Sequence, residues 1–148
     1  MKVVIDANEM PRLAQLLGNL FTDIEFVHVR DLGLMEASDQ QLFEELNSRG
    51  FDLLITRDLN QLRNPDEMEG LRGSGLSWIG HKESKKNGLA GLREILATYS
   101  VALPHVQSVL RESGEAMYFK LRKLPAGASQ LIQYARNFRD GEAFKLPR

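Results

Sequence analysis

The sequence contains no cysteine and no long apolar run. The first absence excludes disulfides, thiolate metal ligands and a cysteine nucleophile. It also suits a reducing compartment, so we expect the protein to be cytoplasmic. Crossing a bilayer takes about 20 consecutive apolar residues, and the N-terminus lacks the apolar stretch of a signal peptide. We therefore expect no membrane contact.

An excess of basic charge is also missing, because 19 Lys and Arg residues face 20 Asp and Glu residues, for a net charge of −1. A strongly basic chain would indicate nucleic-acid binding over much of the surface. Any contact with nucleic acid here must use a local basic patch, helped by a metal ion. The 148 residues, 43% of them hydrophobic, fit one domain of ordinary size. We expect a single domain over residues 1–148.

The first half of the chain alternates short apolar runs with helical patterns. Such runs are typical of strands buried on both faces. They cover residues 2–5, 26–29, 53–55 and 76–79. Between them, leucines recur at helical spacing over 13–20, and Ser38 with Gln41 forms a capping-box pattern that opens a second helix. This alternation predicts an α/β domain with a mainly parallel sheet and right-handed crossovers.

The second part, from about residue 88 to 148, is more helical and carries no motif. Apolar stripes predict a helix over 89–99 and another that begins near Pro104. Residues 117–121 predict a last strand, at the sheet edge or antiparallel. A final helix is expected around 131–135. The apolar helices of 89–110 could cover the sheet, or they could form a homo-oligomer or partner surface.

Acidic residues follow two of the predicted strands. Asp6 comes directly after the first, and Asp58 follows the third. Ligands of open parallel sheets bind outside the carboxyl ends of the strands, and neighbouring strands lie about 4.8 Å apart. Asp39, at a predicted helix start, is a third candidate. Taken singly, each aspartate could be only a turn or cap residue.

Together the three carboxylates indicate a metal site. They would repel each other unless a cation neutralised them. Oxygen ligands suit Mg²⁺ or Mn²⁺, and such an ion activates water and stabilises charge on a phosphoryl group. The pattern therefore predicts phosphodiester hydrolysis, with Asp6, Asp39 and Asp58 as catalytic and metal-binding residues.

Four segments in order resemble the PIN-like family, and more narrowly its short bacterial branch related to toxin–antitoxin ribonucleases and the Mut7-C type. These segments are residues 1–8 (MKVVIDAN), 28–34 (HVRDLGL), 37–39 (ASD) and 54–58 (LITRD). The resemblance covers about the first 60 residues. It implies a three-layer fold with a central parallel sheet flanked by helices, and the activity of a metal-dependent ribonuclease. RNA is the implied substrate, and an antitoxin protein is an implied partner.

The resemblance also implies supporting roles around the three aspartates. Asn8 and Thr56 would orient the metal ligands from behind. Members of the branch often carry another acid two positions after the aspartate of the Thr-Arg-Asp motif, where this chain has Asn60. A neutral amide holds a divalent ion less firmly than a carboxylate. Asp66 and Glu67 are nearby acids that could compensate.

Basic residues near the same edge are candidates for substrate binding. They are Arg57, His81, Lys82, Lys85 and Lys86. If the fourth strand is parallel to the others, the last four follow its carboxyl end, where they could hold RNA phosphates. The alternatives are a solvated loop for this segment and an ion pair for Arg57.

Three functions are compatible with the sequence. The first is a metal-dependent ribonuclease, with the toxin of a toxin–antitoxin pair as a specific form. The second is a non-catalytic PIN-like module that binds RNA or a protein, which Asn60 and the neutral charge favour. The third, a phosphotransfer protein, ranks last because Asn8 stands where a haloacid-type phosphatase needs a second aspartate.

Overall fold

A computed structural model describes residues 1–122 and 124 of the chain. Five parallel strands form its sheet in the order β2-β1-β3-β4-β5. Their bounds are Lys2–Ile5 (β1), Glu25–His28 (β2), Leu53–Thr56 (β3), Ser77–Gly80 (β4) and Tyr118–Lys120 (β5). The predicted parallel sheet is confirmed. The last strand takes the predicted edge position, and it runs parallel to β4 rather than antiparallel.

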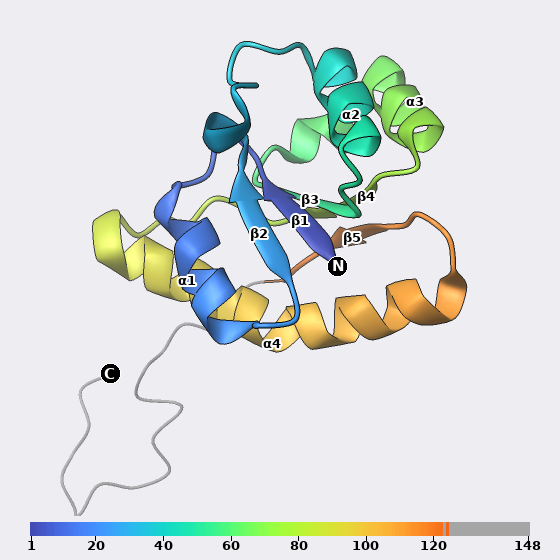
Figure 1. Cartoon of the computed structure of the whole chain (residues 1–148). Coiled ribbons are helices and arrows are strands. Elements are labelled where there is room, and N and C mark those ends of the chain that lie inside the picture. Colours follow the sequence, from blue (N-terminus) through green and yellow to red (C-terminus); the bar gives the residue numbers. More distant parts are fainter. Residues whose placement is uncertain (123, 125–148) are drawn as a thin grey trace, which may run out of the picture.

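Within residues 1–122, four α-helices cover the sheet in a three-layer arrangement, as the resemblance implied. Helices α2 and α3 lie on one face, and α1 and α4 lie on the other (Figure 1). The helices are α1 (Arg12–Leu20), α2 (Asp39–Ser48), α3 (Pro65–Ser74) and α4 (Gly88–Ser113), with short 3₁₀ helices η1 (Val29–Leu32) and η2 (Leu59–Leu62). The predicted capping box of α2 is present, because the Ser38 hydroxyl accepts from the Gln41 N–H and the Gln41 side chain accepts from the Ser38 N–H.

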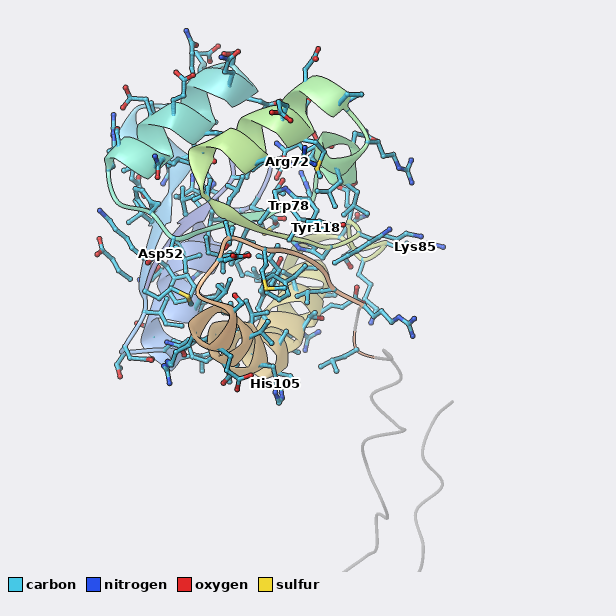
Figure 2. The ribbon with its side chains drawn as sticks, turned by 90° about the vertical axis from the view of Figure 1, so that its right-hand side faces the viewer. Asp52, Arg72, Trp78, Lys85, His105 and Tyr118 are labelled. Atoms are coloured by element: carbon cyan, nitrogen blue, oxygen red, sulfur yellow. The ribbon has the colours of Figure 1, made fainter. Side chains whose placement is uncertain are left out.

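Side chains alternate between the two faces of the sheet, and this alternation decides where the residues beyond each strand lie. One core joins Ile5, Ile55 and Ile79 to the inner faces of α1 and α4. The other joins Val4, Leu54 and Trp78 to α2 and α3. Trp78, 1% exposed, lies between the sheet and α3 (Figure 2). The same alternation continues past the strand ends into the acidic edge.

Helix α4 is continuous, and the predicted break near Pro104 is wrong. Pro104 lies inside the helix, where its ring removes one backbone hydrogen bond. Leu103 and Val106 are both buried in the core on either side of it, so packing against the sheet holds the helix together across the proline. The final helix predicted around 131–135 lies outside the described residues.

One strand boundary also differs from the prediction. The second strand ends at His28, because Val29 begins η1 instead of continuing the strand. The glycine-rich stretch before β4 is helical: Gly70 and Gly73 belong to α3, and Gly75 ends the helix in the left-handed conformation at φ 71°. Among the helices of residues 1–122, none is long and apolar enough to cross a membrane.

Candidate functional site

Asp6 continues β1 into the carboxyl edge of the sheet. Its N–H donates to the Ile55 carbonyl at 2.9 Å, so the backbone hydrogen bonding between β1 and β3 extends to Asp6 and fixes the position of its carboxylate. Two residues beyond Val4, it belongs to the face covered by α2 and α3. Its side chain is 7% exposed and accepts two hydrogen bonds of 2.7 Å, from the Thr56 hydroxyl and from the Ala7 N–H.

Thr56, at the end of β3, joins the two strand ends. Its hydroxyl donates to Asp6 and accepts from the Asp58 N–H at 3.0 Å and from the Asn8 side-chain amide at 3.2 Å. Asn8 also accepts from the Arg57 N–H at 3.5 Å. Thr56 and Asn8 therefore hold Asp6 and the start of the Asp58 turn in a fixed relation.

Asp39 begins α2 and is oriented by a buried glutamine. The Gln61 side-chain amide donates to Asp39 Oδ1 at 3.4 Å. Gln61 is only 2% exposed, and its oxygen accepts from the Trp78 indole N–H at 2.9 Å. The tryptophan thus has a second role besides filling the core, since it fixes the amide that contacts Asp39. Sequence reasoning missed Gln61, because its position in a polar stretch gives no sign of burial.

Glu67 is a fourth acid that lies near the predicted aspartates. It lies in the first turn of α3, where the Asn64 side-chain amide donates to its Oε1 at 2.7 Å. Burial raises the pKa of Glu67, and the nearby charge of Asp39 and then that of Asp58 raise it further. Glu67 therefore belongs to one acidic group with Asp6, Asp39 and Asp58. The sequence offered it only as an acid that could compensate for Asn60.

Electrostatic repulsion is built into this acidic group. The pKa of Asp6 is raised first by burial, and the charges of Asp39 and Asp58 add to the effect. The hydrogen bonds from Thr56 and Ala7 lower this pKa and offset part of the increase. Carboxylates that raise each other's pKa are relieved when a cation binds among them.

The donor chemistry fits a hydrated Mg²⁺ or Mn²⁺. All four candidate ligands are carboxylates, the oxygen ligands that such ions prefer. Within residues 1–122, however, no three Asp, Glu or His side chains converge closely enough to form a ready metal-binding cluster. Mg²⁺ commonly keeps several waters and uses only one or two carboxylates. The acidic group fits an ion of that kind better than one enclosed by protein ligands.

Asn60 contacts the acidic group through its backbone. Its N–H donates to Asp58 Oδ1 at 3.0 Å, which caps the 3₁₀ helix η2, and its side chain is exposed. The position where the resemblance implied an acid is therefore a solvent-facing one in this chain. Glu67, reaching in from α3, brings the fourth carboxylate instead.

Three of the predicted substrate-binding residues, Arg57, His81 and Lys86, line one cavity on the face of the sheet opposite Asp6. Alternation along β3 and β4 directs Arg57 and His81 to the face of α1 and α4, away from Asp6. Arg57 pairs with Glu83 at 3.1 Å, and Lys86 lies 3.6 Å from Glu94. Lys82 and Lys85 are exposed, and Lys85 projects from the molecule on the side opposite Asp52 (Figure 2).

His81 is buried, with 1% of its surface exposed, and it has two partners in the interior. Its Nε2 lies 2.9 Å from Glu9 Oε1, and its Nδ1 lies 2.6 Å from the Tyr99 hydroxyl. Tyr99 comes from α4 and is fully buried, and Glu9 is 8% exposed. Sequence reasoning missed Glu9 and Tyr99, because their contacts with His81 join three distant parts of the chain.

The first half of the chain matches a known protein family. A family model described as a PIN like domain matches residues 1–81. The chain belongs to the PIN-like domain family. In this PIN-like domain the matched region runs from β1 through β4 and contains the whole acidic group. Searches of curated proteins and of solved structures found no match. A PIN-like domain suggests a nuclease-type superfamily, which favours the first two functions over a phosphotransfer protein.

Proposed function

We propose that this PIN-like domain is a Mg²⁺- or Mn²⁺-dependent ribonuclease that hydrolyses RNA phosphodiester bonds at the acidic group. The observation that carries the proposal is the buried carboxylate of Asp6, whose pKa is raised by burial and by the charges of Asp39 and Asp58. This repulsion between carboxylates destabilises the folded state when no cation is bound. Acids with perturbed pKa values of this kind cluster at functional sites.

The residues of the acidic group have separable roles in this proposal. Asp6 and Asp58, joined through Thr56, would hold the ion, with Asp39 contacting it directly or through water. The bound ion would supply a more acidic water and neutralise charge on the phosphoryl group. Glu67, whose pKa is raised above its ordinary value by burial and by the charge of Asp39, would accept the proton of the attacking water.

Substrate binding needs little net positive charge under this proposal. A metal ion cancels part of the negative charge of the acidic group, and the exposed Lys82 and Lys85 follow β4 at the same end of the sheet. Phosphate contacts of this kind position a nucleic acid without reading its sequence. Binding is therefore expected to weaken as salt increases.

The test is cleavage of a mixed RNA pool with and without Mg²⁺ or Mn²⁺. The wild type and an Asp6→Asn/Asp58→Asn double variant are compared with Asp31→Asn, an exposed aspartate of η1. Metal-dependent cleavage by the wild type and by Asp31→Asn, with at least about a hundredfold loss in the double variant, supports the proposal. Equal cleavage by all three would assign the activity to a contaminant.

The second candidate is a non-catalytic module that binds RNA or a protein partner. Two observations favour it, namely the exposed Asn60 and the lack of a ready metal cluster within residues 1–122. It predicts RNA binding that is unchanged by chelation of divalent ions and no cleavage in any metal. Metal-dependent cleavage that Asp6→Asn abolishes excludes it.

The toxin role is a narrower form of the first proposal. It predicts that production of the wild-type protein in bacterial cells slows growth and that Asp6→Asn relieves the effect. An antitoxin partner would then restore growth by covering the acidic edge. Normal growth with active, metal-dependent protein would leave the ribonuclease and remove the toxin role.

A further inference from the structure

A cavity of about 170 Å³ lies beside the acidic group, on the other face of the sheet. It is bounded by the turn after β1, the loop after β4 and the first turns of α4. Glu9 and Arg57 connect it to the acidic edge, because the Glu9 N–H donates to the Asp6 carbonyl at 3.0 Å and Arg57 lies between Thr56 and Asp58. The cavity and the acidic group therefore share the carboxyl edge of the sheet.

The cavity has an apolar floor and a buried polar wall. Leu13, Leu92 and Ile95 form the floor, and Glu9 and His81 form part of the wall. An enclosed apolar space of about 150 Å³ accepts one benzene ring. By volume, the cavity therefore admits a flat heterocyclic ring.

Charge in the cavity is balanced, which disfavours a phosphate group. The lining contains Arg57 and Lys86 together with Glu9 and Glu83. Arg57 already pairs with Glu83 at 3.1 Å, and Lys86 lies 3.6 Å from Glu94. A phosphate would have to break one of these pairs and would meet the carboxylate of Glu9. A neutral ring with polar edges meets no such penalty.

The His81 network keeps Glu9 as a hydrogen-bond acceptor. The Tyr99 hydroxyl lies 2.6 Å from His81 Nδ1, and the Glu9 carboxylate lies 2.9 Å from His81 Nε2. With a phenol that donates to Nδ1, a neutral imidazole carries its proton on Nε2. That proton is not aligned with Glu9, so the buried Glu9 Oε1 accepts no hydrogen bond from the described residues. At the rim, Asn87 makes no side-chain cap bond, so the first N–H groups of α4 are donors there.

We propose that this cavity is a base-binding subsite that holds an unpaired cytosine of the RNA next to the cleaved bond. The 4-amino group of cytosine would donate to Glu9, which is the contact that carboxylates make with this base. Its ring carbonyl would accept from the N–H groups at the start of α4. Uracil presents an oxygen to Glu9 in place of the amino group, and single-stranded RNA is commonly read by such splayed-out bases. The inference rests on the proposed ribonuclease function.

The direct test is binding of the four nucleosides, without phosphate, to the metal-free wild-type protein. Binding is monitored through the backbone amide signals of Gly88 and Gly91 in NMR spectra. Cytidine is expected to move these signals and to bind about tenfold more tightly than uridine. Equal responses to all four nucleosides, or no response at these glycines, would overturn the proposal. This readout does not depend on cleavage.

Variants separate the subsite from the acidic group. Leu92→Phe fills the floor and is expected to abolish cytidine binding, whereas Leu96→Phe, a half-buried leucine of α4 outside the cavity lining, is the matched control. Glu9→Gln is expected to remove the preference for cytidine over uridine. Cleavage without cytidine binding would leave the ribonuclease and overturn the subsite. Cytidine binding without cleavage would support the subsite and overturn the ribonuclease.

Discussion

The Thr56 hydroxyl donates a hydrogen bond of 2.7 Å to Asp6 Oδ2, and this bond joins the ends of β3 and β1. It is made between buried groups, since Thr56 is fully buried and Asp6 is 7% exposed. The Thr56 hydroxyl oxygen also accepts a hydrogen bond from the Asp58 N–H. One hydroxyl therefore sets the relative position of Asp6 and Asp58, which are 52 residues apart in the chain.

Replacing Thr56 by valine should damage both stability and activity. The change keeps the shape but leaves Asp6 Oδ2 and the Asp58 N–H without a partner, which costs about 1–3 kcal/mol of unfolding free energy. Thr98→Val is the control, because that buried hydroxyl bonds only within α4, to the Glu94 carbonyl. Denaturant unfolding and RNA cleavage are the measurements. Thr56→Ser should restore both, and an unaltered Thr56→Val protein would contradict this role.

Glu67→Gln should stabilise the metal-free protein near neutral pH. The folded-state pKa of Glu67 is raised, by burial first and then by Asp39, so its favourable contribution is complete below its ordinary pKa of 4.5 and is lost as pH rises through the raised value. A glutamine stays neutral and keeps that contribution. The melting temperature of Glu67→Gln should exceed that of the wild type at pH 7 and converge with it near pH 4.

Glu69→Gln is the control for this pH dependence. Glu69 is an exposed acid of the same helix, paired with Arg72 at 3.2 Å. Its replacement should give no gain at pH 7, since such surface pairs contribute little. A gain of equal size in both variants would point to the net charge of α3, and not to the acidic group, as the cause.

Gly80→Ala should disturb the acidic group from a distance. A Cβ at Gly80 would lie 2.0 Å from the Trp78 ring, so the indole that anchors Gln61 and through it Asp39 must move. Overpacking of this kind costs about 1–3 kcal/mol. Gly18→Ala is the matched control, because its Cβ meets nothing within 4 Å and alanine favours the helix. The melting temperature and the rate of RNA cleavage should fall only in Gly80→Ala.

Binding of Mg²⁺ should strengthen as pH rises. The pKa of Asp6 is raised above its ordinary 3.8 and that of Glu67 above its ordinary 4.5, so protons compete with the ion until pH passes these raised values. Each proton released on binding changes the affinity by about tenfold per pH unit over that range. Titration calorimetry from pH 5 to 8 measures it. An affinity independent of pH would mean that the ion binds away from these two acids.

The parallel sheet and the strand-end aspartates were predictable because they depend on local sequence. A β-branched run followed by Asp6, and a leucine run followed by Thr56 and Asp58, define buried strands with polar ends. The Ser38 capping box likewise depends on residues three positions apart. In each case the physical cause lies within a few residues of its effect.

The remaining features depend on tertiary packing. Glu67 reaches the acidic group because α3 packs beside α2, and nothing in its own neighbourhood indicates that contact. His81 follows a strand, as the lysines after it do, but only the position of Tyr99 on α4 makes it a buried residue. Pro104 predicted a helix boundary by its local effect, and the apolar stripe on both sides of it proved the stronger influence.

The central claim is that the acidic group binds a divalent ion through Asp6, and the most direct measurement is a crystal structure of the protein soaked in Mn²⁺, with the ion located by its anomalous signal. The account predicts a peak about 2.1–2.2 Å from an Asp6 carboxylate oxygen, with a further ligand from Asp39, Asp58 or Glu67 and the remaining positions filled by water. The peak should be missing in Asp6→Asn. An ion bound elsewhere, or none at Asp6 at millimolar Mn²⁺, would contradict the account.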